Sequence, residues 1–242
     1  RLTAVGNVTV SSVSVTVNSL SSLAVAGDRV AAAQSDLRSS GGNILLNSTG
    51  VLTLRDGDSN QQAVVTSGAG HVVLHATGLH VYADVVTANG EITLNITGNA
   101  RWFSGAEGTG RLRSTQGDLH VMVNGSLLME DGSLIETTSG SIRLVSLGNL
   151  TLSSVQAPAG LIALNSAAAI LDGGDSLVDL RAARLQMIAL TGIGLLGGSF
   201  NPLNTDVRLL AARTQAGPFA MANTGTLQVG AVDGPVAMVN LS

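Results

Sequence analysis

The chain has 242 residues, of which 45% are hydrophobic and 12% are charged, and its formal net charge is −4. All 12 basic residues are arginines, and there is no cysteine. An acidic chain without a basic stripe cannot neutralise phosphates, so we expect no nucleic-acid partner. The missing cysteine excludes disulfides and thiolate metal sites. No apolar run reaches the roughly 18 residues of a membrane span, and the composition is too apolar for a disordered segment.

The first 41 residues are predicted to form strands without a regular spacing. Apolar residues recur from Val8 to Val25, but no fixed interval separates them. The chain begins at Arg1 without a signal-peptide pattern, which favours a mature fragment or a piece of a longer protein.

A repeat begins at Gly42 and organises the region 42–196. Each unit starts at a residue that we call an anchor, and the anchors are Gly42, Gly70, Gly90, Gly117, Gly140, Gly160 and, degenerately, Ala183. The residues two positions later form the predicted core ladder: Ile44, Val72, Ile92, Leu119, Ile142 and Ile162, followed by Leu185. Large apolar residues also stand four positions after each anchor. Alternation with period two predicts a strand with one buried face.

Two further strands are predicted in each unit. A second glycine comes eight residues after most anchors, and a second apolar pair follows it, as in Leu52 and Leu54. A third strand is marked five residues before the next anchor by Val65, Val85, Leu112, Ile135, Val155 and Val178. Glycine is expected at the corners because it adopts positive φ without a Cβ penalty. The pattern predicts an all-β chain: a parallel β-helix, or solenoid, with three short strands per coil and roughly ten coils.

One coil allows two registers. In the first, Tyr82 and Trp102 point inward in adjacent coils and stack inside the rod, with His80 also inward. In the second, a slip places Leu79 and Val81 inward and Tyr82 on the surface. A one-residue slip exchanges the two faces of a strand.

Towards the C-terminus the eight-residue step returns at Gly217 and Gly225, and Gly234 opens a further coil. We therefore expect one β-helix over 1–242, with irregular first coils at 1–41, regular coils at 42–196 and less regular last coils at 197–242. No capping helix is visible at either end, and solenoids normally need caps. The expected partner is thus a second copy, head to tail, or the rest of a longer solenoid.

The candidate chemistry is sparse. Asp-Gly loops offer weak calcium candidates at Asp56, Asp58, Asp172 and Asp175, but ordinary turn composition explains them better. A polysaccharide-cleaving enzyme would need clustered acids and a basic partner; the residues to map are Arg55, Asp56, Asp58, Glu130 and Asp131. The scattered acids favour a protein that is not an enzyme and needs no cofactor.

Six sequons could carry glycans on exposed turns: Asn7, Asn47, Asn95, Asn124, Asn149 and Asn240. A structural role competes with glycosylation. Asn47, Asn95 and Asn165 all stand five residues after an anchor, where a side chain can bond the turn backbone or stack on its counterpart.

The stretch from Ile170 to Val236 resembles the repeats of giant bacterial surface proteins related to filamentous haemagglutinin. The similar segments include Leu190–Gly194, Asn201–Leu203, Thr205–Val207, Leu210–Thr214 and Asn223–Gly230, and the units at Gly90, Gly140 and Gly160 share their style. The resemblance implies a right-handed β-helix that is secreted and serves as an adhesin stalk or filament.

The predicted function is a structural rod, stalk or filament subunit, outside the cell or on its surface. Two alternatives remain: a carbohydrate-active β-helix enzyme, and a segment that binds glycans or receptors through its loop face. Exposed aromatic residues would favour the binding segment, and Trp102 and Phe103 are the local candidates.

Overall fold

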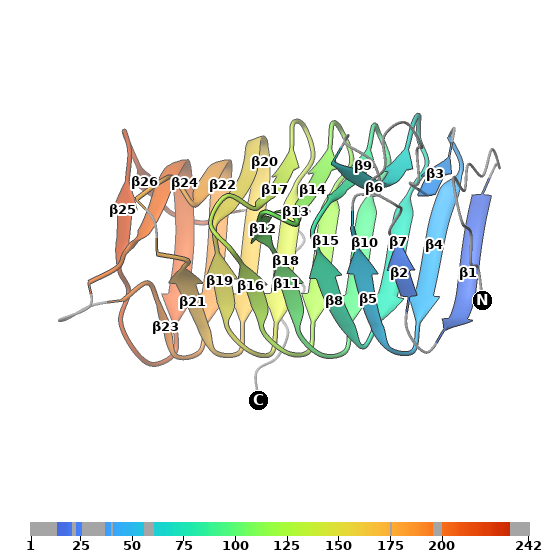
Figure 1. The fold of residues 1–242 in the computed structure, drawn as a ribbon. Coiled ribbons are helices and arrows are strands. Elements are labelled where there is room, and N and C mark those ends of the chain that lie inside the picture. The colour runs from blue at the N-terminus through green and yellow to red at the C-terminus, as the bar shows by residue number, and fades with distance from the viewer. Residues whose placement is uncertain are drawn as a thin grey trace.

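A computed structural model describes residues 14–20, 23–25, 37–39, 41–55, 61–174, 176–195 and 200–232. These residues are all-β, without a helix, and their parallel strands stack as a solenoid. Figure 1 shows the coils in a row, from blue near the N-terminus to red near the C-terminus. The described residues make about seven turns, where roughly ten were predicted for the whole chain.

Strands that begin their coils pair with one another along the rod. This first stack contains β1 (Ser14–Leu20), β4 (Asn43–Ser48), β7 (Val72–Ala76), β10 (Ile92–Ile96), β15 (Leu119–Val123) and β18 (Ile142–Ser146). It continues through the second halves of β20 (Ser154–Ser166), β22 (Leu180–Ala189) and β24 (Leu203–Thr214), and ends at β26 (Gln228–Val229).

The second stack forms a separate sheet. It contains β2 (Leu23–Val25), β5 (Val51–Leu54), β8 (Gly78–Val81), β11 (Ala100–Trp102), β16 (Leu127–Met129), β19 (Leu150–Leu152), β21 (Ala169–Asp172) and β23 (Gly192–Ile193). A small antiparallel hairpin, β12 (Ser104–Gly105) with β13 (Gly108–Thr109), projects between β11 and the third strand of that coil.

The third stack contains β3 (Leu37–Ser39), β6 (Gln62–Thr66), β9 (Asp84–Thr87), β14 (Arg111–Ser114), β17 (Leu134–Thr137), the first halves of β20, β22 and β24, and β25 (Met221–Asn223). In the last coils the third strand runs without interruption into the first strand of the next coil. The first and third stacks are therefore joined into one sheet by β20, β22 and β24.

The predicted core ladder lies in one register. Ile44 pairs with Val72, and the line passes from coil to coil to Ile162 and Leu185. The six ladder residues are at most 1% exposed: Ile44, Val72, Ile92, Leu119, Ile142 and Ile162. Since successive rungs lie about 4.8 Å apart, each apolar side chain is buried mainly against its neighbours above and below.

The coil that contains Tyr82 takes the second of the two predicted registers. Leu79 and Val81 are buried and pair with Leu52 and Leu54, whereas Tyr82 lies on the outer side. The predicted stack of Tyr82 on Trp102 inside the rod is therefore wrong. The corner is one residue shorter here, since Gly78 already pairs with Val51 as the first strand residue, and this exchanges the two faces.

Two residues predicted for the third-strand column do not lie in it. Val64, not Val65, pairs with Val85 and is buried, because a register shift follows Gln62. At the other end, Leu180 replaces Val178 and pairs with Val155. Both errors occur after loops of irregular length, where counting from the anchor does not locate the strand.

The reason given for the anchor glycines is also wrong. Gly70, Gly90, Gly117, Gly140 and Gly160 do not have positive φ. Each is needed because successive corners pack backbone on backbone. A Cβ on Gly117 would collide with the carbonyl oxygen of Gly90, and the same collision recurs at each of the other four with the anchor before it.

Buried hydroxyls line the corner beside these glycines. The members pair in register and are Ser39, Thr66, Thr87, Ser114 and Thr137. Thr137 donates to the carbonyl of Gly117 at 2.9 Å and accepts the N–H of Gly140 at 3.1 Å. The column thus satisfies backbone groups that the turn leaves outside the strand ladders.

The last described residue, Val232, packs against the outer side of the solenoid. Its neighbours are Leu161 and Ala163 of β20, with Leu209 and Ala211 of β24 alongside. The outward Leu161 and Ala163 are therefore buried beneath the chain itself. The contact lies on the side of the solenoid and involves neither β1 nor β26 at its ends.

Candidate functional site

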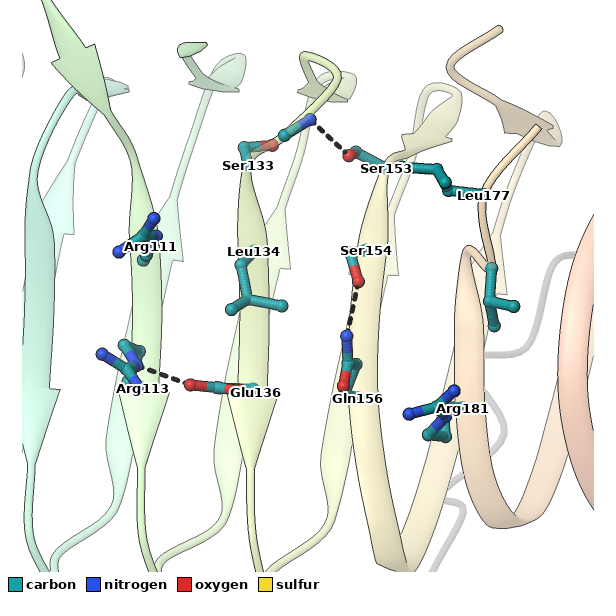
Figure 2. Close-up of a pocket in the computed structure, with 12 residues that line it drawn as sticks. Arg111, Arg113, Ser133, Leu134, Glu136, Ser153, Ser154, Gln156, Leu177 and Arg181 are labelled. Carbon is teal, nitrogen blue, oxygen red and sulfur yellow. Dashed lines mark hydrogen bonds and ion pairs between the residues drawn. The ribbon is translucent and has the colours of Figure 1, made fainter. Parts of the chain in front are cut away.

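A groove of about 570 Å³ lies on the outer side of the third stack. Its floor is made by outward residues of β14, β17, β20 and β22, and its rim by residues of the corners before those strands, including Ser133 and Leu177 (Figure 2). We call it the arginine groove, because Arg111, Arg113 and Arg181 all line it.

The stacking of coils produces two rows of side chains in the groove. Four successive coils place one side chain each in the first row, in register: Arg113, Glu136, Gln156 and Arg181. Arg113 and Arg181 therefore stand about 14 Å apart, at three strand spacings. The neighbouring row contains Arg111, Leu134 and Ser154. Figure 2 shows Arg111 and Arg113 at one end and Arg181 at the other.

The arginines differ in how far their charge is balanced. Arg113 pairs with Glu136 and lies 3.8 Å from Asp84, while Arg181 donates to Asp206 at 3.1 Å. Arg111 is only half-buried, and no ion pair or hydrogen bond of its guanidinium is found among the described residues. The groove therefore offers one uncommitted guanidinium beside two that are shared.

This arrangement can bind an anionic group. A guanidinium presents a planar fork of donors that matches carboxylate, sulfate and phosphate oxygens. Ser154 and Gln156, joined by a 2.9 Å hydrogen bond, add neutral polar groups beside it. The groove lining carries three arginines and one carboxylate, which is a positive balance on a chain of net charge −4.

A second cluster lies on the outer side of the second stack, where four side chains stack along the rod. The guanidinium of Arg55 lies 4.0 Å from the ring centre of Tyr82, and Tyr82 stacks on Phe103 at 4.1 Å and 8°. The guanidinium of Arg101 lies 4.5 Å from the ring centre of Phe103. Tyr82 and Arg101 are both too close to that centre to share one face of the ring, so they occupy opposite faces.

These rings do not offer an open platform for a sugar. Both faces of Tyr82 and of Phe103 are taken by the stack, and Trp102, the other predicted aromatic candidate, is 0% exposed in the core. Partial burial, together with the charges of Arg101 and Arg55, lowers the pKa of His80 beside the stack. The cluster is best understood as an outer ladder that ties successive coils together.

Glu130, a candidate acid of the enzyme hypothesis, belongs to this ladder. Its carboxylate accepts from Arg101 at 2.9 Å and from the N–H of Ser104 at 2.9 Å. Partial burial alone would raise the pKa of Glu130, but these two partners outweigh burial and lower it. An ionised carboxylate held in this way is poorly suited to donate a proton at neutral pH. Arg55, its predicted basic partner, pairs instead with Glu107.

Of the calcium candidates, only Asp172 lies within the described residues; Asp56, Asp58 and Asp175 lie outside them. Asp172 is 8% exposed and pairs in register with the inward Leu152. Its Oδ1 accepts the N–H of Gly174 at 2.9 Å, which is a turn contact. The two neighbouring acids of the enzyme hypothesis, Glu130 and Asp131, lie at the corner after β16.

Four sequons fall within the described part of the chain, and Asn7 and Asn240 fall outside it. Asn124 and Asn149 are exposed, whereas Asn47 and Asn95 are half-buried. Asn149 accepts the N–H of Ala169 at 3.1 Å through Oδ1, so it helps to hold the next coil.

Two structural roles were considered for Asn47, Asn95 and Asn165, and one of them, stacking on one another, is wrong. Their column does run along one line of the first stack, but other residues separate them. Asn47 pairs with His75, which pairs with Asn95, and Met122 and Val145 follow before Asn165.

The arginine groove was not predicted from the sequence. The signal was present in the residues that flank the third-strand column, since Arg111 and Arg113 flank Leu112 and Arg181 follows Leu180. The sequence alone does not show that the stacked coils bring these three arginines to one groove.

The described residues contain no helix with the length and hydropathy needed to cross a membrane. No protein-family model matches the chain, and neither curated proteins nor solved structures give a match. The chain is a parallel β-solenoid with an arginine-lined groove on one outer face.

Proposed function

We propose that this chain is a structural rod: a stalk or filament segment of a surface protein outside the cell. The observation that carries the proposal is the unbroken apolar ladder, which passes through every regular coil from Ile44 to Leu185. Such a ladder makes each coil depend on the next and resists bending between them. A rod of this kind needs no reaction and no cofactor. The resemblance to haemagglutinin-type repeats, which implies a right-handed coil, is consistent with this role.

The proposed partner is another copy of the chain or a continuing solenoid. Among the described strands, β1 pairs only with β4 and so has one free edge. At the other end, Val229 of β26 is 74% exposed. Free parallel edges can pair with a further chain, and a head-to-tail contact that does not close produces a filament.

Replacing Val229 by Lys tests this assembly. A charge on an edge strand opposes pairing with a second chain, so V229K is expected to stay monomeric at concentrations where the parent chain forms rods. Sedimentation velocity over a concentration series, with electron microscopy of the same samples, measures the effect.

Met122→Lys is the matched control, because Met122 is 43% exposed on a central strand rather than at an end. It is expected to assemble like the parent. A parent chain that stays monomeric at high concentration would contradict self-assembly and leave only the role as part of a longer rod.

A second candidate function, binding of an anionic glycan, is favoured by the uncommitted Arg111 in the arginine groove. A sugar chain that carries carboxylates would meet Arg111 and Arg113 at one end and Arg181 at the other, with Ser154 and Gln156 between them. This candidate is compatible with the rod, because the groove lies on its outer side.

The test is calorimetric titration with an oligosaccharide of uronic acids, compared with a neutral oligosaccharide of equal length. Arg111→Ala is expected to weaken binding roughly 10-fold, the loss of one charge-assisted hydrogen bond. Arg208→Ala, at an exposed position outside the groove, is expected to change nothing. Equal binding of the neutral sugar, or equal losses in both variants, would refute the assignment.

A further inference from the structure

A regular line of hydrogen bonds runs along the corner that follows each anchor, and it is interrupted at one place. In this line the residue after an anchor accepts, through its side chain, the N–H of the corresponding residue in the next coil. Asn43 accepts from His71 at 2.9 Å, and Ser141 accepts from Leu161 at 3.3 Å. Between these two coils, Nδ1 of His71 accepts the N–H of Glu91 at 3.1 Å, and Oδ1 of Asp118 accepts the N–H of Ser141 at 2.7 Å.

The interruption lies between Glu91 and Asp118. Among the described residues, the N–H of Asp118 makes no such bond to the Glu91 side chain, although Ile92 and Leu119 beside them pair in register. Two carboxylates therefore stand at equivalent positions of adjacent coils, an arrangement that repulsion disfavours. The carboxylate of Glu91 lies instead within reach of a third group.

That group is the imidazole of His120. Potential ligand atoms of Glu91, Asp118 and His120 all lie within 4.8 Å of one another on the outer side of the first stack. His120 is half-buried, and neither of its ring nitrogens has a hydrogen-bond partner in the described part of the chain. Asp118 is half-buried too, and its Oδ2 remains available while Oδ1 holds Ser141.

We propose that Glu91, Asp118 and His120 form a binding site for a divalent cation of the zinc class. One imidazole nitrogen and two carboxylate oxygens are ligands that Zn²⁺ accepts, at about 2.0–2.2 Å. The three ligand atoms lie within 4.8 Å of one another, and the Glu91 side chain is exposed, so it can turn towards an ion held by Asp118 and His120. Water completes the coordination.

The neighbouring charges set the strength of this site. His71 lies on one side; its Nδ1 accepts the N–H of Glu91 and stands 4.0 Å from a carboxylate oxygen of the same residue. On the other side Arg143 pairs in register with His120 and reduces the local negative potential. The bound ion joins the coil of Gly90 to the coil of Gly117, and it thereby repairs the interrupted line.

The test is calorimetric titration of metal-stripped protein with ZnCl₂, with the visible absorption of Co²⁺ as a second readout. The parent chain is expected to bind one ion saturably. His120→Ala and Glu91→Gln are each expected to weaken binding by about 10-fold or more, since even changes around a ligand cost that much. Glu91 is exposed, so its replacement leaves the fold intact.

His75→Ala is the matched control, because His75 is an exposed outward histidine on β7 of the same stack but lies outside the cluster. It is expected to bind like the parent. Weak uptake without saturation in all four proteins, or an affinity that neither His120→Ala nor Glu91→Gln changes, would overturn the site.

Discussion

At the scale of the residue, the anchor glycines show why this fold tolerates so little at its corners. Their backbone atoms meet those of the previous anchor, and the hydroxyls of Ser114 and Thr137 bond the same turns from inside. The sequence pattern located these glycines because they recur with the apolar ladder. It did not reveal their role, because a close approach between two coils depends on positions that are distant in the chain.

Gly117→Ala is expected to destabilise the chain by about 1–3 kcal/mol, because the new methyl group collides with the backbone of Gly90. Denaturant unfolding monitored by circular dichroism measures this change. Gly230→Ala is the control: its Cβ would lie 3.8 Å from Leu209, so the expected change is within about 0.5 kcal/mol. Equal stabilities of G117A and the parent would contradict the close packing of the corners.

At the scale of the element, register decided which predictions held. The first stack was predicted well, because the inward ladder residue stands a fixed two positions after each anchor. The second and third strands follow corners of unequal length. Two registers therefore stayed open for Tyr82, and Val65 and Val178 were placed in the wrong column. The arginine groove depends on the same variable strands, which is why the sequence alone could not assemble it.

The outer ladder of the second stack gives a prediction about pH. Since the folded state lowers the pKa of Glu130 below its ordinary value of 4.5, ionised Glu130 stabilises the fold above that pH. The contribution is lost as the pH falls through the lowered pKa. Glu130→Gln is therefore expected to melt below the parent at pH 7 and to approach it in strong acid.

Thermal melts at several pH values measure this difference. Glu107→Gln removes a carboxylate from the more exposed pair with Arg55, and its melting temperature is expected to stay near that of the parent, because exposed pairs contribute little. A constant gap between E130Q and the parent across the whole range would show that charge at Glu130 does not stabilise the ladder.

At the scale of the whole molecule, the fold class followed from composition and period together. Few charges, few aromatics and a repeat of 20 to 28 residues fit a narrow core filled by Leu, Ile and Val, and the structure has such a core. The cluster of Glu91, Asp118 and His120 was missed because its members belong to different coils and meet only through stacking. Sites on the outside of a solenoid form between side chains of neighbouring coils. Residues that are adjacent in the sequence lie within one coil, so the sequence does not show which side chains meet.

The hydrogen bonds between coils, such as that from Ile92 to Asp118, point along the axis of the stack. Tension applied between the two ends would therefore act in the direction of these bonds and load one junction between neighbouring coils at a time. Because each coil contacts only its neighbours, extension would proceed by successive losses of single coils and dissipate work at each one. A solenoid built in this way would lose its coils one at a time under a sudden pull, and it could refold from the coils that remain.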